Sequence, residues 1–193
     1  MVKVSQAELV AGAIAGSAVS FPTDTVPALA MKPELARRIY QLKQRPATKP
    51  LILLGASIED LLAYVSYTEA ELAVWQKLID KHLPGALTLV LPASAKVPTS
   101  INPTNSKTVG IRIPDLPLAR EILSQTGVLA TTSANISGQD ALTSMDAIAE
   151  TFPEVLVLDE ANIIGSGLPS TVVSWQNPQW QVLRQGSVEV KLG

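Results

Sequence analysis

The chain has 193 residues, of which 47% are hydrophobic and 17% charged, so we expect a folded protein with a sizeable core and not a disordered chain. It contains no cysteine and one histidine, His82, which excludes disulfides, thiolate nucleophiles and metal sites built on cysteine or clustered histidines. The formal net charge is −2. We expect one domain over residues 1–193.

The N-terminal region predicts a helix over residues 6–16. The stretch 9–19 is apolar and follows Lys3, as in a signal peptide, but it is too short to span a bilayer. Ser5 and Glu8 have the spacing of a capping box, which favours an ordinary first helix. No later segment is a candidate membrane span, so we expect a soluble, cytoplasmic protein.

The rest of the chain alternates between helical and strand patterns. Long loops are expected at 92–107 and 159–170, which are rich in Pro, Gly, Ser and Asn. The interleaving predicts an α/β fold with a mixed, twisted sheet. Further helices are predicted over 33–43, 57–64, 68–82, 115–126 and 144–151, and strands over 17–21, 51–55, 87–91, 108–113, 128–132, 155–158, 171–175 and 180–184.

Basic residues are concentrated in two windows that contain no Asp or Glu, residues 35–58 and 81–114. The first holds five basic residues and the second four, which together are nine of the fifteen in the chain. If the windows fold together, they form a positive surface suited to a phosphate-bearing ligand; otherwise they are scattered solubilising charges. The distribution alone leaves both interpretations open.

Three polar stretches lie at the ends of predicted strands, where open α/β sheets place ligand-binding loops. They are SFPTDT (20–25), GIRIPDLP (110–117) and TTSANISG (131–138). The hydroxyl, amide and backbone N–H groups of TTSANISG suit an anion cradle, although a polar turn is the simpler interpretation. Neither a P-loop nor a dinucleotide fingerprint is present.

Lys43 and Arg45 lie where the helix predicted over 33–43 ends against Pro46. Both suit phosphate oxygens, but cations at a helix C-terminus also complement the helix dipole. His82 is distant in sequence from the polar loops and is interpreted as a capping or surface residue, so no Ser-His-acid triad is expected. Any chemistry should therefore depend on positioning and electrostatics.

Six short motifs occur in order along the chain: FPTDTV, LKQRP…KPL, LPGALTLVL, TVGIRIP…P, SANISG and STVV. With them, the chain from about residue 8 to 186 resembles the YrdC-like threonylcarbamoyl-adenylate synthases. The resemblance implies a YrdC-like twisted open mixed sheet with helices around a concave, positively charged cavity. It also implies a chain that ends where the catalytic domain ends, without the additional C-terminal domain of longer relatives.

The activity that this resemblance implies joins L-threonine, bicarbonate or CO2 and ATP into threonylcarbamoyl-AMP and pyrophosphate. The product leads to a modified adenosine in tRNA, so tRNA and tRNA-modification proteins are implied partners. Mg²⁺ would enter with ATP, with few protein ligands and no metal site of the protein's own.

The resemblance also implies roles for individual residues. A Lys-x-Arg and Ser-x-Asn tetrad would hold the ATP phosphates and adenylate. Two further residues would lie near the nucleotide, and four would face threonine. Among these four, Arg112 would bind the threonine carboxylate with its two-pronged guanidinium group. The tetrad is Lys43, Arg45, Ser133 and Asn135; the nucleotide residues are Thr108 and Arg184; the threonine residues are Thr23, Arg112, Thr131 and Ser170.

Several positions depart from the family's usual pattern. The TVYGLG of the family is replaced by residues 25–30, TVPALA, and Leu54 stands where a histidine is common. Leu83 and Ala86 replace the residues that usually flank Pro-Gly, and Ser174 replaces an aspartate. Most of these changes are expected on the amino-acid side, so we expect retained nucleotide binding with looser amino-acid selection.

Two other functions fit the same residues. The first is an RNA-binding or ribosome-associated module that binds tRNA or double-stranded RNA; against it, the chain is acidic and has only two Phe, three Tyr and three Trp for base stacking. The second is a catalytically silent, nucleotide-binding paralogue that senses a small ligand, which the altered TVPALA segment makes plausible.

Overall fold

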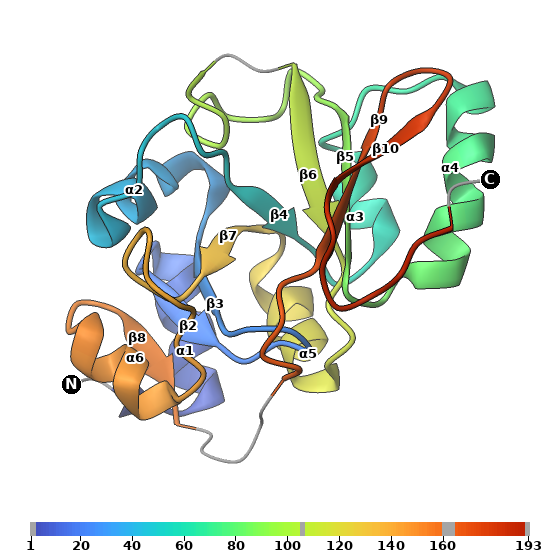
Figure 1. Cartoon of the computed structure of the whole chain (residues 1–193). Helices are drawn as coiled ribbons and strands as arrows, with labels where there is room; N and C mark the ends of the chain where they lie inside the picture. The colour runs from blue at the N-terminus through green and yellow to red at the C-terminus, as the bar shows by residue number, and fades with distance from the viewer. Residues whose placement is uncertain (1–2, 105–106, 160–164, 192–193) are drawn as a thin grey trace.

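A computed structural model describes residues 3–104, 107–159 and 165–191 (Figure 1). Its strands are β1 (Lys3–Val4), β2 (Val19–Phe21), β3 (Ala28–Met31), β4 (Ile52–Leu54), β5 (Leu87–Pro92), β6 (Thr108–Arg112), β7 (Leu129–Ser133), β8 (Leu156–Leu158), β9 (Thr171–Trp175) and β10 (Trp180–Arg184). Its helices are α1 (Gln6–Ala15), the 3₁₀ turn η1 (Pro33–Leu35), α2 (Arg37–Lys43), α3 (Ile58–Leu62), α4 (Glu69–His82), α5 (Pro117–Thr126) and α6 (Met145–Thr151).

These strands form a sheet in the order β1-β8-β2-β3-β7-β4-β6-β5-β9-β10. Strands β4 and β6 pair in parallel, as do β5 and β9, whereas β3, β7 and β4 are successively antiparallel. The expected α/β class with a mixed sheet is confirmed. The order brings β7, β4, β6, β5 and β9 side by side, so polar residues from distant parts of the sequence reach one region of the sheet.

Two apolar clusters hold helices against the sheet. In the first, α1 and α5 pack together through Leu9, Ala13 and Ile122. In the second, α4 contributes Trp75, which makes an edge-to-face contact with Trp175 of β9 (ring centroids 6.0 Å apart), and α6 contributes Ile148. In Figure 1, α4 flanks β9 and β10 at one side of the molecule, and α6 lies beside β8 at the other.

Helix ends agree closely with the sequence signals. The capping boxes Ser5/Glu8 and Thr68/Glu71 are both formed. Helix α5 ends at Gly127, which has a positive φ and whose N–H donates to the carbonyl of Leu123. No helix among the described residues is both long and apolar enough to cross a membrane.

The secondary structure differs from the prediction in one helix and two strands. The helix predicted over 33–43 is broken into η1 and α2, because a 3₁₀ turn starting at Pro33 closes on Ala36 before the α-helix begins. Strand β3 was not predicted. All four of its residues are buried, so it lacks the polar alternation that marks a half-exposed strand, and Pro27 precedes it. The short strand β1 was also missed.

Candidate active site

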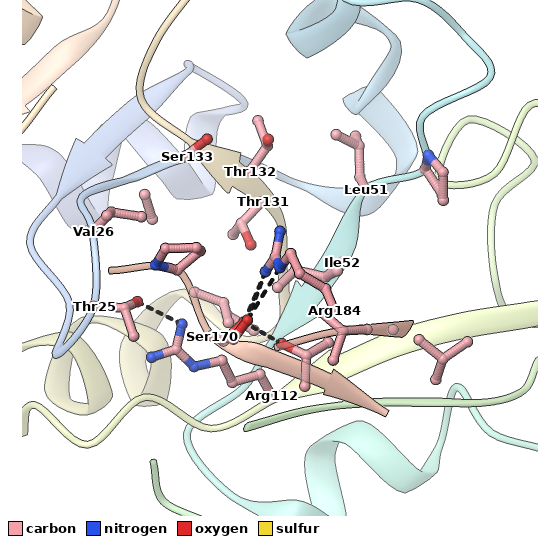
Figure 2. A pocket seen from close by; sticks show the side chains of 18 of the residues that line it. Thr25, Val26, Leu51, Ile52, Arg112, Thr131, Thr132, Ser133, Ser170 and Arg184 are labelled. Carbon is pink, nitrogen blue, oxygen red and sulfur yellow. Dashed lines mark hydrogen bonds between the residues drawn. The ribbon is translucent and has the colours of Figure 1, made fainter. Parts of the chain in front are cut away.

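A cavity of about 440 Å³ opens above strands β4 to β7 and β9, against the loop that joins β2 to β3 (Figure 2). Three arginines line it, from the turn after α2, from β6 and from β10, together with a series of threonine and serine residues. No acidic residue lies among the described residues of its wall. Its apolar portion includes Val26, Ala28, Ile52 and Leu54.

Eight of the ten residues predicted for the site line this cavity: Thr23, Arg45, Thr108, Arg112, Thr131, Ser133, Ser170 and Arg184. The two acid-free windows therefore do meet at one cavity, through Arg45 and Arg112 among other residues. The remaining two predicted residues, Lys43 and Asn135, are buried behind Ser133 and are not part of the described wall. His82 also lies away from the wall.

Lys43 is the last residue of α2, and its side chain is only 1% exposed. Its ammonium group donates to the carbonyl oxygen of Ser133 and, at 2.9 Å, to Oδ1 of Asn135. Burial, reinforced by the charge of Arg45, lowers the pKa of Lys43 from 10.5 to about 7. Lys43 thus ties α2 to the end of β7, where Ser133 faces the cavity.

Asn135 links the same loop together. Its Oδ1 accepts the hydroxyl of Ser133 at 2.6 Å, and its amide donates to the carbonyl oxygens of Ile136 and Gln139 at 2.9 and 2.7 Å. With Lys43 as a further donor, all the polar atoms of this buried side chain have partners. The Ser-x-Asn pair therefore shapes the loop after β7, and Ser133 is the member that reaches the cavity.

Arg45 follows α2 and orders the turn before β4. Its Nε donates to the carbonyl of Lys49 at 3.0 Å and its Nη2 to that of Pro50 at 2.9 Å. Gln44 takes a left-handed conformation (φ 51°), which ends the helix and directs the chain, with Arg45, to the cavity. Burial lowers the pKa of Arg45, but an arginine stays charged at neutral pH.

The TDT segment after β2 forms a self-contained hydrogen-bonded turn. The Thr23 hydroxyl donates to the carbonyl of Val26 at 2.7 Å and accepts the N–H of Thr25 at 3.2 Å, and the two threonine hydroxyls lie 3.0 Å apart. A hydroxyl has one donor and two acceptor positions, so that of Thr23 is fully used within its own loop. Thr23 lines the cavity without a spare hydrogen bond.

A second segment braces the TDT turn from outside. The N–H groups of Ser166 and Gly167 donate to the carbonyls of Asp24 and Thr25 at 2.9 and 3.0 Å. Gly165 lies so close that a Cβ there would sit 2.4 Å from the carbonyl oxygens of Thr23 and Thr25. Only glycine permits this approach.

Arg112, at the end of β6, is 4% exposed and held at three points. Its Nε donates to the carbonyl of Gly85 at 2.9 Å, its Nη1 to the hydroxyl of Thr25 at 2.7 Å and its Nη2 to Oδ1 of Asp24 at 2.6 Å (the Thr25 contact is drawn in Figure 2). Burial lowers the pKa of Arg112, and the charge of Asp24 opposes that shift. One hydrogen on each terminal nitrogen has no partner among the described residues.

Arg184 and Ser170 close the cavity on the side of β9 and β10. A register shift between Val182 and Arg184 re-aims the Arg184 side chain, which donates to the Ser170 carbonyl at 2.8 and 3.2 Å (Figure 2). The Ser170 hydroxyl lies 2.8 Å from that of Thr88. On β7, by contrast, the Thr131 hydroxyl has no hydrogen-bond partner among the described residues, although Thr131 is 2% exposed.

Asp24, Thr25 and Thr88 are residues of the site that the sequence reasoning did not assign. Asp24 and Thr25 belong to the FPTDTV motif, so a signal existed, but their contact with Arg112 joins positions 88 and 87 residues apart. Thr88 belongs to the LPGALTLVL motif, but no role was assigned to it. No group of three or more His, Asp or Glu side chains in the described part of the chain is placed to hold a metal ion.

The comparisons with known proteins agree on one family. The model of the Sua5/YciO/YrdC family, described as telomere recombination, matches residues 14–186. The chain is 32% identical to the threonylcarbamoyl-AMP synthase of Hydrogenovibrio crunogenus, over 88% of this chain and 91% of the relative. It is also 32% identical to that of Bacillus subtilis, over 88% of this chain and 50% of the relative.

A solved structure extends this similarity to three dimensions. The structure of P. abyssi Sua5 complexed with L-threonine superposes with a TM-score of 0.83 and 31% identity, over 95% of this chain and 55% of that one. The chain thus spans about half the length of the Bacillus and P. abyssi relatives and most of the Hydrogenovibrio one. On the matched motifs, sheet and relatives, the chain belongs to the Sua5/YciO/YrdC family.

Proposed function

We propose that the protein is a threonylcarbamoyl-AMP synthase, which converts L-threonine, bicarbonate or CO2 and ATP into threonylcarbamoyl-AMP and pyrophosphate. The observation that carries the proposal is the convergence of residues from all six motifs on one cavity with three arginines. The relatives named as this synthase and the threonine complex of P. abyssi Sua5 support it. These comparisons do not favour the RNA-binding alternative.

In the proposed arrangement, Arg45 and Ser133 contact the ATP phosphates, and Arg184 and Thr108 lie near the nucleotide. Lys43 and Asn135 act indirectly, because their contacts fix the loop that places Ser133 at the cavity. Mg²⁺ enters on the triphosphate, since the described residues offer no acidic cluster for it.

On the amino-acid side, the two remaining N–H groups of Arg112 would hold the carboxylate of threonine, and Thr131 and Ser170 would supply hydroxyl contacts. Thr23 would contribute shape, because its hydroxyl is used within its own turn. The amine of threonine then forms a carbamate with bicarbonate or CO2. A carbamate oxygen attacks the α-phosphorus of ATP and pyrophosphate leaves, so the residues position the reactants and stabilise charge without a protein nucleophile.

The proposal is tested by pyrophosphate release from ATP, Mg²⁺ and bicarbonate, with each amino acid added in turn. We expect release that depends on both threonine and bicarbonate, with threonylcarbamoyl-AMP as the product. Nucleotide binding without release under any of these conditions would point to the silent paralogue instead. We also propose that the product passes to tRNA-modification proteins acting on tRNA in the cytoplasm, which a coupled tRNA assay would show.

The Arg45→Ala variant is expected to weaken ATP binding by roughly 10- to 150-fold, because it removes a charge-assisted contact worth about 1.5–3 kcal/mol. Calorimetric titration with ATP and Mg²⁺ measures this. Arg37→Ala is the matched control, since Arg37 is an exposed arginine at the start of the preceding helix, α2, and does not line the cavity. Equal ATP affinity in Arg45→Ala and Arg37→Ala would reject the phosphate role.

A further inference from the structure

The three arginines of the cavity differ in how their charges are compensated. Arg112 forms an ion pair with Asp24, with Nη2 and Oδ1 2.6 Å apart and side chains only 5% and 16% exposed. Arg45 and Arg184 donate to backbone carbonyls, and neither forms an ion pair with a carboxylate among the described residues. Of the three positive charges on the wall, Arg112 is therefore the one with a described partner of opposite charge.

Asp24 compensates the charge of Arg112 from behind the cavity wall. The threonines on either side of it, Thr23 and Thr25, line the cavity, whereas Asp24 is not among the described lining residues. Its backbone carbonyl accepts the N–H of Ser166 at 2.9 Å, and its carboxylate accepts Nη2 of Arg112 at 2.6 Å. The contact of Asp24 with the site is therefore through Arg112, whose plane it holds and whose charge it offsets.

The compensation matters most for a ligand with several negative charges. Arg184 and Arg112 line the same cavity, and the charge of Arg184 is one of the causes that lower the pKa of Arg112. Without Asp24 the two guanidinium groups would form a divalent anion site. A polyphosphate gains much more from such a site than a single carboxylate does, because Coulomb attraction scales with the product of the charges. With Asp24 present, Arg112 still offers two N–H groups for directional hydrogen bonds.

We propose that Asp24 is a positioning residue that excludes polyphosphate from Arg112 and keeps that end of the cavity for a monocarboxylate. The proposal rests on the proposed function, in which Arg112 receives the amino acid and Arg45 the phosphates. It assigns the aspartate of the TDT turn a role in selectivity: the turn orients Arg112 through Thr25, and the carboxylate decides which anion Arg112 accepts.

The test is calorimetric titration of the Asp24→Asn variant with inorganic pyrophosphate. Asparagine keeps an acceptor for Nη2 but removes the charge, so we expect pyrophosphate to bind about tenfold more tightly than to the original protein. L-Threonine should then compete with pyrophosphate in the variant and not in the original protein. A purely structural role would not produce tighter binding.

Two control variants separate charge from packing. Asp115→Asn removes the carboxylate of an Asp–Arg pair outside the cavity, with Arg120 at 3.0 Å, and should leave pyrophosphate affinity unchanged. Thr25→Val removes a neutral acceptor of the same guanidinium and should not tighten pyrophosphate binding. Pyrophosphate affinity in Asp24→Asn equal to that of the original protein, or no measurable pyrophosphate binding in either, would overturn the proposal.

Should Asp24→Asn fail to fold, the double variant Asp24→Asn/Arg112→Gln tests the proposal instead, because it removes both charges of the ion pair. We expect its pyrophosphate affinity within about threefold of the original, against about a tenfold loss for Arg184→Gln. A double variant that loses as much as Arg184→Gln would show that the Arg112 charge is available to polyphosphate. Absence of threonine-dependent pyrophosphate release in the original protein would refute the proposed function separately.

Discussion

Replacement of Lys43 with alanine is expected to lower the free energy of unfolding by about 3 kcal/mol and to abolish synthesis. Lys43 is among the largest fully buried side chains, and truncation leaves a cavity where its stem packs. It also removes the donor to the Ser133 carbonyl and to Asn135, so the loop after β7 loses its anchor to α2. Thermal or urea unfolding measures the loss.

The matched variant Lys43→Met separates packing from the amine. Methionine fills most of the same volume, so we expect a loss below about 1.5 kcal/mol with synthesis still abolished. Unfolding free energies of Lys43→Ala and Lys43→Met that agree within error would show that the stem contributes little. Full activity of Lys43→Met would remove the ammonium group from the mechanism.

The pH dependence of stability gives an independent readout of the buried amine. The pKa of Lys43 is about 7 in the folded protein and 10.5 as the ordinary value, so between these pH values the unfolded chain binds the additional proton. Stability of the original protein, measured relative to Lys43→Met, should therefore rise from pH 7 to 10, by at most about 1.4 kcal/mol per pH unit. Below pH 7 the stabilities of the original protein and of Lys43→Met should change with pH in the same way.

Local signals in the sequence predicted most elements correctly, because caps and apolar runs act over a few residues. Thr68 and Glu71 begin α4, and strands β9 and β10 were predicted over the residues that the structure shows. Strand β3 escaped because it is buried on both sides between β2 and β7, so its residues 28–31 show no alternation. That strand places residues 28–30 of the TVPALA segment in the sheet.

Eight of the ten residues predicted for the site line one cavity, but their hydrogen-bond partners could not be predicted from the sequence. The motifs identified Lys43 and Arg112 as chemically important, yet nothing local indicates that one is buried against a carbonyl 90 residues away and the other is paired with Asp24. Such contacts depend on the order of β7, β4 and β6 in the sheet. Whether a polar side chain faces a ligand or its own neighbours is therefore decided by topology.

Hydrogen-bonding capacity is small on the side of the cavity that we propose binds the amino acid. The Thr23 hydroxyl is used by its own turn, and Leu54 and Ala28, which line the cavity, carry no polar group. The Thr131 hydroxyl is without a partner among the described residues and is the best placed to recognise a substrate hydroxyl. A single neutral hydrogen bond of this kind is worth about 1–3 kcal/mol when its loss leaves a buried partner unpaired, so it rejects an isostere lacking the hydroxyl by about a hundredfold at most.

Preference for L-threonine over serine and valine, measured as the ratio of kcat/KM for threonylcarbamoyl-AMP synthesis and its analogues, should therefore stay within about a hundredfold. Valine tests the hydroxyl, whose hydrogen bond is worth about 1–3 kcal/mol, and serine tests the methyl group, which is worth about the same. In Thr131→Val the threonine-to-valine ratio should approach one, while the threonine-to-serine ratio changes little. A threonine preference far above a hundredfold in the original protein, unaffected by Thr131→Val, would mean that a group other than Thr131 recognises the hydroxyl. The first alternative would be Thr23, released by opening of the TDT turn.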